Sequence, residues 1–125
     1  MTPNDFRRIA LQMPDAIEGE HMAHPDFRAH GRIFATLHPD GKQGMVKLTP
    51  EQQHTLLREY PATFTPASGA WGRQGCTMVR LSRVDEETLG DAMTLAWQLA
   101  ATAKVKSGNL KLKTSKTTAR TKRRV

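Results

Sequence analysis

The chain has 125 residues and a formal net charge of +7, and a single domain of this length can bury a core without staples. Its single cysteine excludes an intramolecular disulfide and a zinc site built from several thiolates, which favours a reducing, cytoplasmic setting. The N-terminus has charges scattered through its apolar positions, and no apolar run approaches the roughly 20 residues that span a bilayer, so neither secretion nor membrane insertion is expected.

The first predicted element is a short amphipathic helix. Thr2 or Asn4 can cap its N-terminus, and Asp5 is favourable near the positive helix end. Pro14 ends the helix because proline cannot continue the backbone hydrogen bonding. The apolar face consists of Phe6, Ile9, Ala10 and Met13.

From residue 16 to residue 48 the apolar pattern alternates, and turn residues separate short runs, which predicts an antiparallel meander. A tight turn is expected at His30-Gly31, and a longer loop at residues 38–42. The alternation of Ile33, Ala35 and Leu37 indicates a buried face. The four predicted strands are Ala16–Met22, Asp26–His30, Ile33–Leu37 and Met45–Leu48.

The segment HMAHPDFRAH, residues 21–30, contains three histidines. His21, His24 and His30 could converge across a hairpin as metal ligands, with His24 in the turn before Pro25. Their spacing does not match the i, i+4 histidine pair of helical zinc sites, so we favour a structural role and predict no metal and no cofactor.

A second helix should follow Thr49-Pro50-Glu51-Gln52, where threonine is the cap and proline takes the first position. Pro61 ends this helix, and residues 61–75 are predicted to be a loop rich in glycine and proline. Within this loop Trp71, Arg73 and Gln74 offer an aromatic face, a cation and an amide, the groups that stack on bases and bind phosphates. Trp71 could equally fold back over the core, and packing is slightly favoured.

Three glycines, Gly69, Gly72 and Gly75, do not form a Walker site, because no Gly-Lys-Ser/Thr follows them and the segment leads into a strand. That strand, residues 76–81, contains Cys76. A buried strand cysteine is favoured over a nucleophile with a histidine base, although the second alternative stays open.

The last predicted helix starts near Asp85 and ends near Lys104, with apolar residues at helical spacing. The order of helix, four strands, helix, strand and helix predicts an α+β two-layer sandwich, in which an antiparallel sheet of about five strands carries helices on one face. Turns this short exclude the crossovers that a parallel sheet needs.

Positive charge is concentrated after the last helix. Residues 1–100 carry ten Lys or Arg and all twelve acids, for a net charge of −2, whereas residues 101–125 carry nine bases and no acid. Few large apolar residues accompany these bases, which predicts a basic, flexible C-terminal tail over residues 104–125 and a domain over residues 1–103.

Three stretches, EGEHMAHPDFRAHGRIFATL, GMVKLTPEQQ and ASGAWGRQGCTMVRL, resemble in their order and separation the MmcQ/YjbR family of small bacterial proteins. The resemblance covers roughly residues 4–100. It implies a compact unit similar to the bacterial frataxin fold, with a double-wing arrangement found in DNA-binding proteins. Many relatives have Tyr-His-Met-Asn-Lys before the last strand, where this chain has residues 67–73 instead.

Together these features predict a non-enzymatic, cytoplasmic protein that binds DNA, chiefly at the phosphate backbone, with weak sequence specificity. An enzyme or a small-molecule or metal-binding protein that uses the histidine-rich segment is the alternative, and a scaffold for a protein partner is another. A membrane partner is not expected. The predicted nucleic-acid-binding residues are Lys104, Lys106, Lys111, Lys113, Lys116, Arg120, Lys122, Arg123, Arg124, Trp71 and Arg73.

Overall fold

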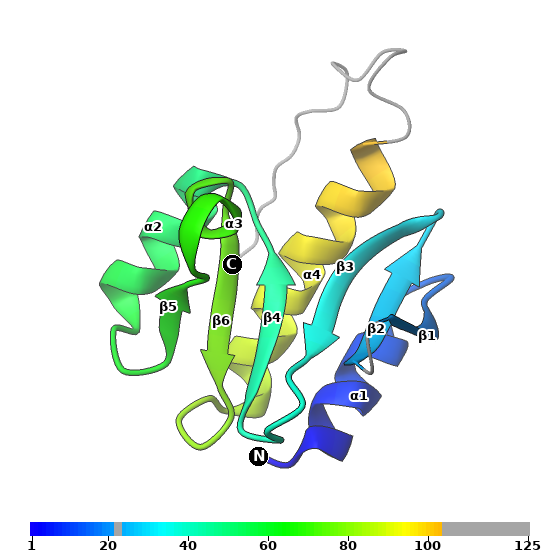
Figure 1. Ribbon diagram of the computed structural model, residues 1–125, viewed down its shortest axis with the longest axis horizontal. Helices are drawn as coiled ribbons and strands as arrows, with labels where there is room; N and C mark the ends of the chain where they lie inside the picture. The colour runs from blue at the N-terminus through cyan, green and yellow to red at the C-terminus, as the bar shows by residue number, and fades with distance from the viewer. Residues whose placement is uncertain (22–23, 104–125) are drawn as a thin grey trace.

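A computed structural model of the chain describes residues 1–21 and 24–103. Its six strands form one antiparallel sheet in the order β1-β2-β3-β4-β6-β5, with helices packed against it (Figure 1). The strands are β1 (Ile17–His21), β2 (His24–Ala29), β3 (Arg32–Leu37), β4 (Gln43–Lys47), β5 (Phe64–Pro66) and β6 (Cys76–Arg80). The helices are α1 (Pro3–Leu11), α2 (Pro50–Glu59), α3 (Gly69–Arg73) and α4 (Glu86–Ala103).

The predicted α+β fold class and the meander of the first four strands are confirmed. His30 and Gly31 both have positive φ angles, 57° and 78°, which is the geometry of a type I′ hairpin turn between β2 and β3. The prediction that residues 61–75 are only loop was wrong. They contain the edge strand β5 and the short helix α3, and both are too brief to produce a periodic pattern.

The predicted helix starts at Thr2 and Thr49 are confirmed as capping boxes. In α1 the Thr2 hydroxyl accepts from the Asp5 backbone N–H at 3.1 Å, and the Asp5 carboxylate accepts from the Thr2 N–H at 2.9 Å. Two hydrogen bonds to the Asp5 carboxylate lower its pKa, first the bond from the Thr2 backbone N–H and then a bond from the Thr2 hydroxyl. Thr49 and Gln52 form the same reciprocal pair in α2. Local sequence alone therefore defines both helix starts.

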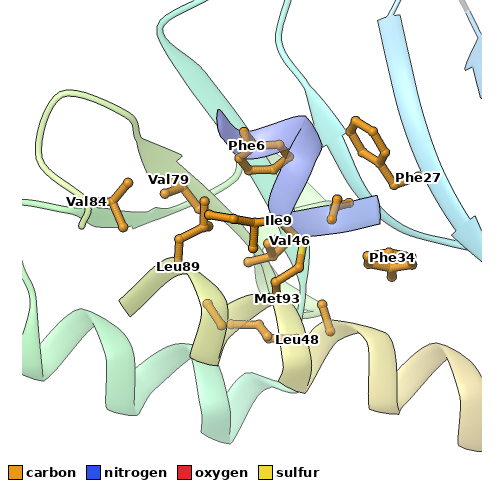
Figure 2. Packing of buried hydrophobic residues seen from close by; sticks show 14 of the residues in the cluster. Phe6, Ile9, Phe27, Phe34, Val46, Leu48, Val79, Val84, Leu89 and Met93 are labelled. Atoms are coloured by element: carbon orange, nitrogen blue, oxygen red, sulfur yellow. The ribbon is translucent and has the colours of Figure 1, made fainter. Parts of the chain in front are cut away.

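The core lies between the sheet and the pair α1 and α4. Figure 2 shows Phe6 and Ile9 of α1 projecting toward Val46 of β4 and toward Met93 of α4. Phe6 is fully buried, and it packs over Gly44 so closely that a Cβ there would overlap its ring. This contact fixes α1 against the middle of the sheet. Leu56 joins α2 to the same buried cluster.

The strands β3 and β4 pair along only half of their length. Their register runs through Ala35, Thr36 and Leu37 of β3 and stops there, so Arg32 to Phe34 have left β4. A register shift between Phe27 and Arg28 on the other side of β3 accompanies this departure. In Figure 1, β3 curves away from β4 at the end opposite to the N-terminus, and α4 passes behind the opening.

The bulge also corrects one expectation about the buried face. Alternation predicted that Ile33 would be buried with Ala35 and that Phe34 would face the other way. Phe34 is in fact fully buried, and Ile33 is only partly covered. The extra residue at a bulge allows two successive side chains to point to similar sides, which a strict period of two cannot represent.

In the part of the chain that the structure describes, no helix has the length and apolar character needed to cross a bilayer.

Candidate functional site

A groove of about 180 Å³ lies where β3 and β4 separate. Its apolar lining residues come largely from α4, and we call them the floor. Its polar and cationic lining residues come from the ends of β3 and β4 and from the α3–β6 connection, and we call them the rim. The lining residues are Arg32, Ile33, Lys47, Leu48, Gln74, Cys76, Ala96, Leu99 and Ala100.

An ion pair within β2 lies at the register shift between β2 and β3. The Asp26 side chain is fully buried, and its carboxylate accepts from Arg28 Nε at 2.7 Å and from Nη2 at 3.0 Å. This carboxylate raises the pKa of Arg28, first through the hydrogen bond and then through its charge. Arg28 is the register partner of Ile33, a lining residue, so the pair stands directly beside the groove.

Helix α3 is held in place by a buried glutamine of α2. Gln53 Nε2 donates to the carbonyl oxygens of Gly72 and Cys76, both at 3.0 Å. Gly75 has a φ of 112°, and a Cβ there would overlap the Leu48 carbonyl oxygen, so this position requires glycine. The start of β6 therefore lies tightly against the end of β4.

This framework presents Trp71 to solvent. The slight preference for a packed Trp71 was wrong, because 63% of the residue is exposed. Arg73 is exposed on the same short helix, and Gln74 caps α3 at its C-terminal end and also lines the groove. An exposed aromatic side chain, a cation and an amide thus stand within one turn of each other.

Two cations, Arg32 and Lys47, stand in the lining of the groove, which contains no acidic residue. Lys47 acts on Cys76, its register partner. Burial raises the pKa of the Cys76 thiol, while the Lys47 charge lowers it by a smaller amount. A raised pKa reduces the thiolate fraction at neutral pH, which disfavours the nucleophile alternative.

The three histidines of residues 21–30 do not all converge, although His21 of β1 and His24 of β2 are register partners. His24 belongs to β2 rather than to a turn, and it lies near His38, with ring centroids 6.1 Å apart. His30 follows the other end of the strand, and its ring lies 6.5 Å from that of Trp97. Over the described ranges, no group of three His, Cys, Asp or Glu residues is arranged to hold a metal ion.

The nine predicted tail residues, Lys104, Lys106, Lys111, Lys113, Lys116, Arg120, Lys122, Arg123 and Arg124, lie outside the described residues. Their point of attachment is nevertheless defined, because α4 is described to Ala103. Leu99 and Ala100, near this end of α4, line the groove. The basic segment therefore joins the domain at the same end as the groove.

Sequence reasoning identified Trp71, Arg73 and Gln74 but missed Arg32 and Lys47. These two cations come from separate strands and meet at the groove because β3 leaves β4. No local pattern marks them, since single cations on strands are common surface residues. The Asp26-Phe27-Arg28 triplet did carry a signal, because residues two apart on a strand share a face.

Comparison with known proteins places these features in a family. The YjbR family model matches residues 11–99. The crystal structure of protein DR2400 from Deinococcus radiodurans, described with the domain DUF419, is similar in fold with a TM-score of 0.67. The two chains are 21% identical, and the alignment covers 83% of this chain and 80% of that one. No curated protein gives a significant match.

Proposed function

The chain belongs to the YjbR family, and we propose that it is a non-enzymatic, cytoplasmic protein that binds DNA with weak sequence specificity. The observation that carries this proposal is the exposed Trp71 beside Arg73, at the end of the domain where Arg32 and Lys47 also lie and where the basic segment is attached. Aromatic faces and cations in one place are the groups that bind a nucleic-acid strand.

The basic segment is the main source of affinity in this proposal. Its nine cations and no acids contrast with a domain of net charge −2 over residues 1–100. Binding of phosphates by Lys and Arg releases condensed counterions, so the affinity falls steeply as the salt concentration rises. Contacts to phosphates carry no base information, and sequence specificity is therefore weak.

The domain adds orientation to this attraction. The β2–β3 hairpin, with its tip at His30-Gly31, projects on one side of the place where β3 and β4 separate, and α3 stands on the other side (Figure 1). We place the hairpin as one wing against the duplex and α3 as the second contact. Trp71 and Arg73 then face the strand that the basic segment attracts.

The test is a salt titration of DNA binding by the 125-residue chain and two variants of it, with a 20-base-pair duplex as the first ligand. In the first variant the nine Lys and Arg residues of 104–124 are replaced by Gln. We expect tight binding at 50 mM salt and a steep dependence on salt for the wild type, with most of that slope lost in the first variant.

The second variant, Trp71→Ala, should weaken binding to a 20-nucleotide single strand at every salt concentration without changing the slope, because tryptophan stacks on unpaired bases and contributes no charge. Ile17→Ala is the matched control, since Ile17 is 62% exposed but lies on the edge strand β1. A wild-type chain that does not bind duplex or single-stranded DNA at 50 mM salt contradicts the proposed function. Equal slopes for the wild type and the glutamine variant contradict the role of the basic segment.

A further inference from the structure

We propose that the groove between β3 and β4 receives one unpaired base of the bound strand, so that the protein prefers unpaired nucleotides to intact duplex. This inference rests on the proposed function and specifies the ligand of the same site. It starts from the separation of β3 and β4, which makes the groove, and from α4, which closes its floor.

The size of the groove fits a single ring. A cavity of about 150 Å³ lined by apolar side chains is large enough to bind benzene, and this groove has about 180 Å³. A larger group, such as a dinucleotide or a long acyl chain, would extend into solvent. The floor, made by Ile33, Leu48, Ala96, Leu99 and Ala100, offers an apolar surface to the face of such a ring.

The rim fits the polar parts of a nucleotide. Gln74 offers both a donor and an acceptor, as the edge of a base requires. Arg32 and Lys47 supply positive charge for the phosphates on either side of the base, and the lining holds no acid to oppose them. Charge complementarity thus favours an anionic strand over a neutral apolar peptide.

Trp71 offers a stacking surface for a second base, next to the one in the groove. It stands on α3, whose C-terminal cap Gln74 is part of the lining, and its side chain is exposed. A base next to the one in the groove can therefore stack on Trp71. A base within a duplex is already stacked and paired, so it reaches the groove only after unpairing.

The experiment compares two single strands of equal length and charge, oligothymidine of 12 nucleotides and a 12-nucleotide strand made of abasic units. The 125-residue chain should bind oligothymidine about tenfold more tightly than the abasic strand, because only oligothymidine has bases to bury and stack. Because the two strands carry the same number of phosphates, the phosphate contribution cancels in the ratio of the two affinities.

Ala100→Leu fills the groove from its floor and should lower this affinity ratio, because stacking on Trp71 alone then distinguishes the two strands. Ala101→Leu is the matched control, since it makes the same change one residue further along α4 and outside the lining. Leu99→Ala, which removes part of the floor, should also lower the ratio. Circular dichroism establishes that each variant is folded.

A measurement on the wild type does not depend on any variant. Cys76 lines the groove, so oligothymidine should slow alkylation of its thiol at pH 9, whereas the abasic strand should not. Equal protection by both strands, or an unchanged affinity ratio in Ala100→Leu, overturns the inference but leaves the proposed function intact. Absence of binding to either strand and to duplex overturns both.

Discussion

The two halves of the β3–β4 pair differ in what covers them, and the proposed function assigns them two purposes, stability and binding. In the paired half, Leu37 faces Gly44, Ala35 faces Val46, and Phe6 of α1 covers the contact. In the separated half, Arg32 and Ile33 have no partner on β4, and α4 forms a floor behind them. The paired half contains the fully buried Ala35 and Val46, whereas the separated half has a cationic rim. The proposed function therefore assigns stability and binding to adjacent stretches of the same strands.

The largest expected loss of stability comes from a substitution in the core over the paired half. Phe6→Ala should lower the free energy of unfolding by about 3 to 5 kcal/mol, because it leaves a cavity over Gly44. Urea denaturation followed by circular dichroism measures the change. Leu11→Ala on the same helix is the control, since Leu11 is 39% exposed and should have a much smaller effect. Equal losses in the two variants would contradict this account of the core.

The next largest loss of stability comes from a substitution that removes the hydrogen bonds holding α3 and the start of β6. Gln53→Leu removes the donor to two buried carbonyl groups, those of Gly72 and Cys76, and should cost about 1 to 3 kcal/mol. Thermal unfolding measures this loss. Gln52→Leu is not a suitable control because Gln52 caps α2, so the exposed His54 is replaced instead. If His54→Leu and Gln53→Leu destabilise equally, Gln53 does not anchor α3.

A substitution at the rim should change stability little and DNA affinity more, and so it separates the two purposes. Lys47→Gln changes a partly exposed cation at the rim, so the free energy of unfolding should change by no more than about 0.5 kcal/mol. DNA affinity should fall, and the magnitude of the salt slope should decrease by about one. Lys42→Gln, in the loop before β4, is the control. If Lys47→Gln leaves the DNA affinity unchanged, Lys47 of the rim does not contact DNA.

The smallest effect concerns pH. Because burial raises the folded-state pKa of Cys76 above its ordinary value of 9.0, the folded state keeps its proton longer than the unfolded state. The stability that follows is complete below pH 9 and is lost as the pH rises through the folded pKa. Above pH 9 the wild type should lose stability relative to Cys76→Ala, as urea titrations at several pH values would measure. Parallel curves would contradict burial of the thiol.

Much of the fold was predictable because its signals are local. The cap at Thr49, the turn at His30-Gly31 and the period of the last helix each depend on neighbouring residues. The strand β5 was missed because three residues that include a proline cannot establish a period. The bulge was missed because it depends on how β2 and β3 align, which no single strand encodes.

The candidate site was predictable only in part for the same reason. Trp71 and Arg73 lie in one short segment, and their chemistry is visible in the sequence. The groove depends on Arg32 and Lys47, which are far apart in the chain and meet only in the folded sheet. The histidines were misleading in the opposite way, because His24 and His30 are close in sequence but occupy the two ends of an extended strand.

The hydrogen bond from Trp97 Nε1 to the Pro14 carbonyl oxygen, 2.8 Å long, has a practical consequence for spectroscopy. The protein has two tryptophans, one anchored between α4 and the segment after α1, and the other exposed on α3. Their emission spectra should differ, because one indole is held by the protein and the other is surrounded by water. With either indole replaced by phenylalanine, the fluorescence of the remaining one reports separately on unfolding or on ligand arrival.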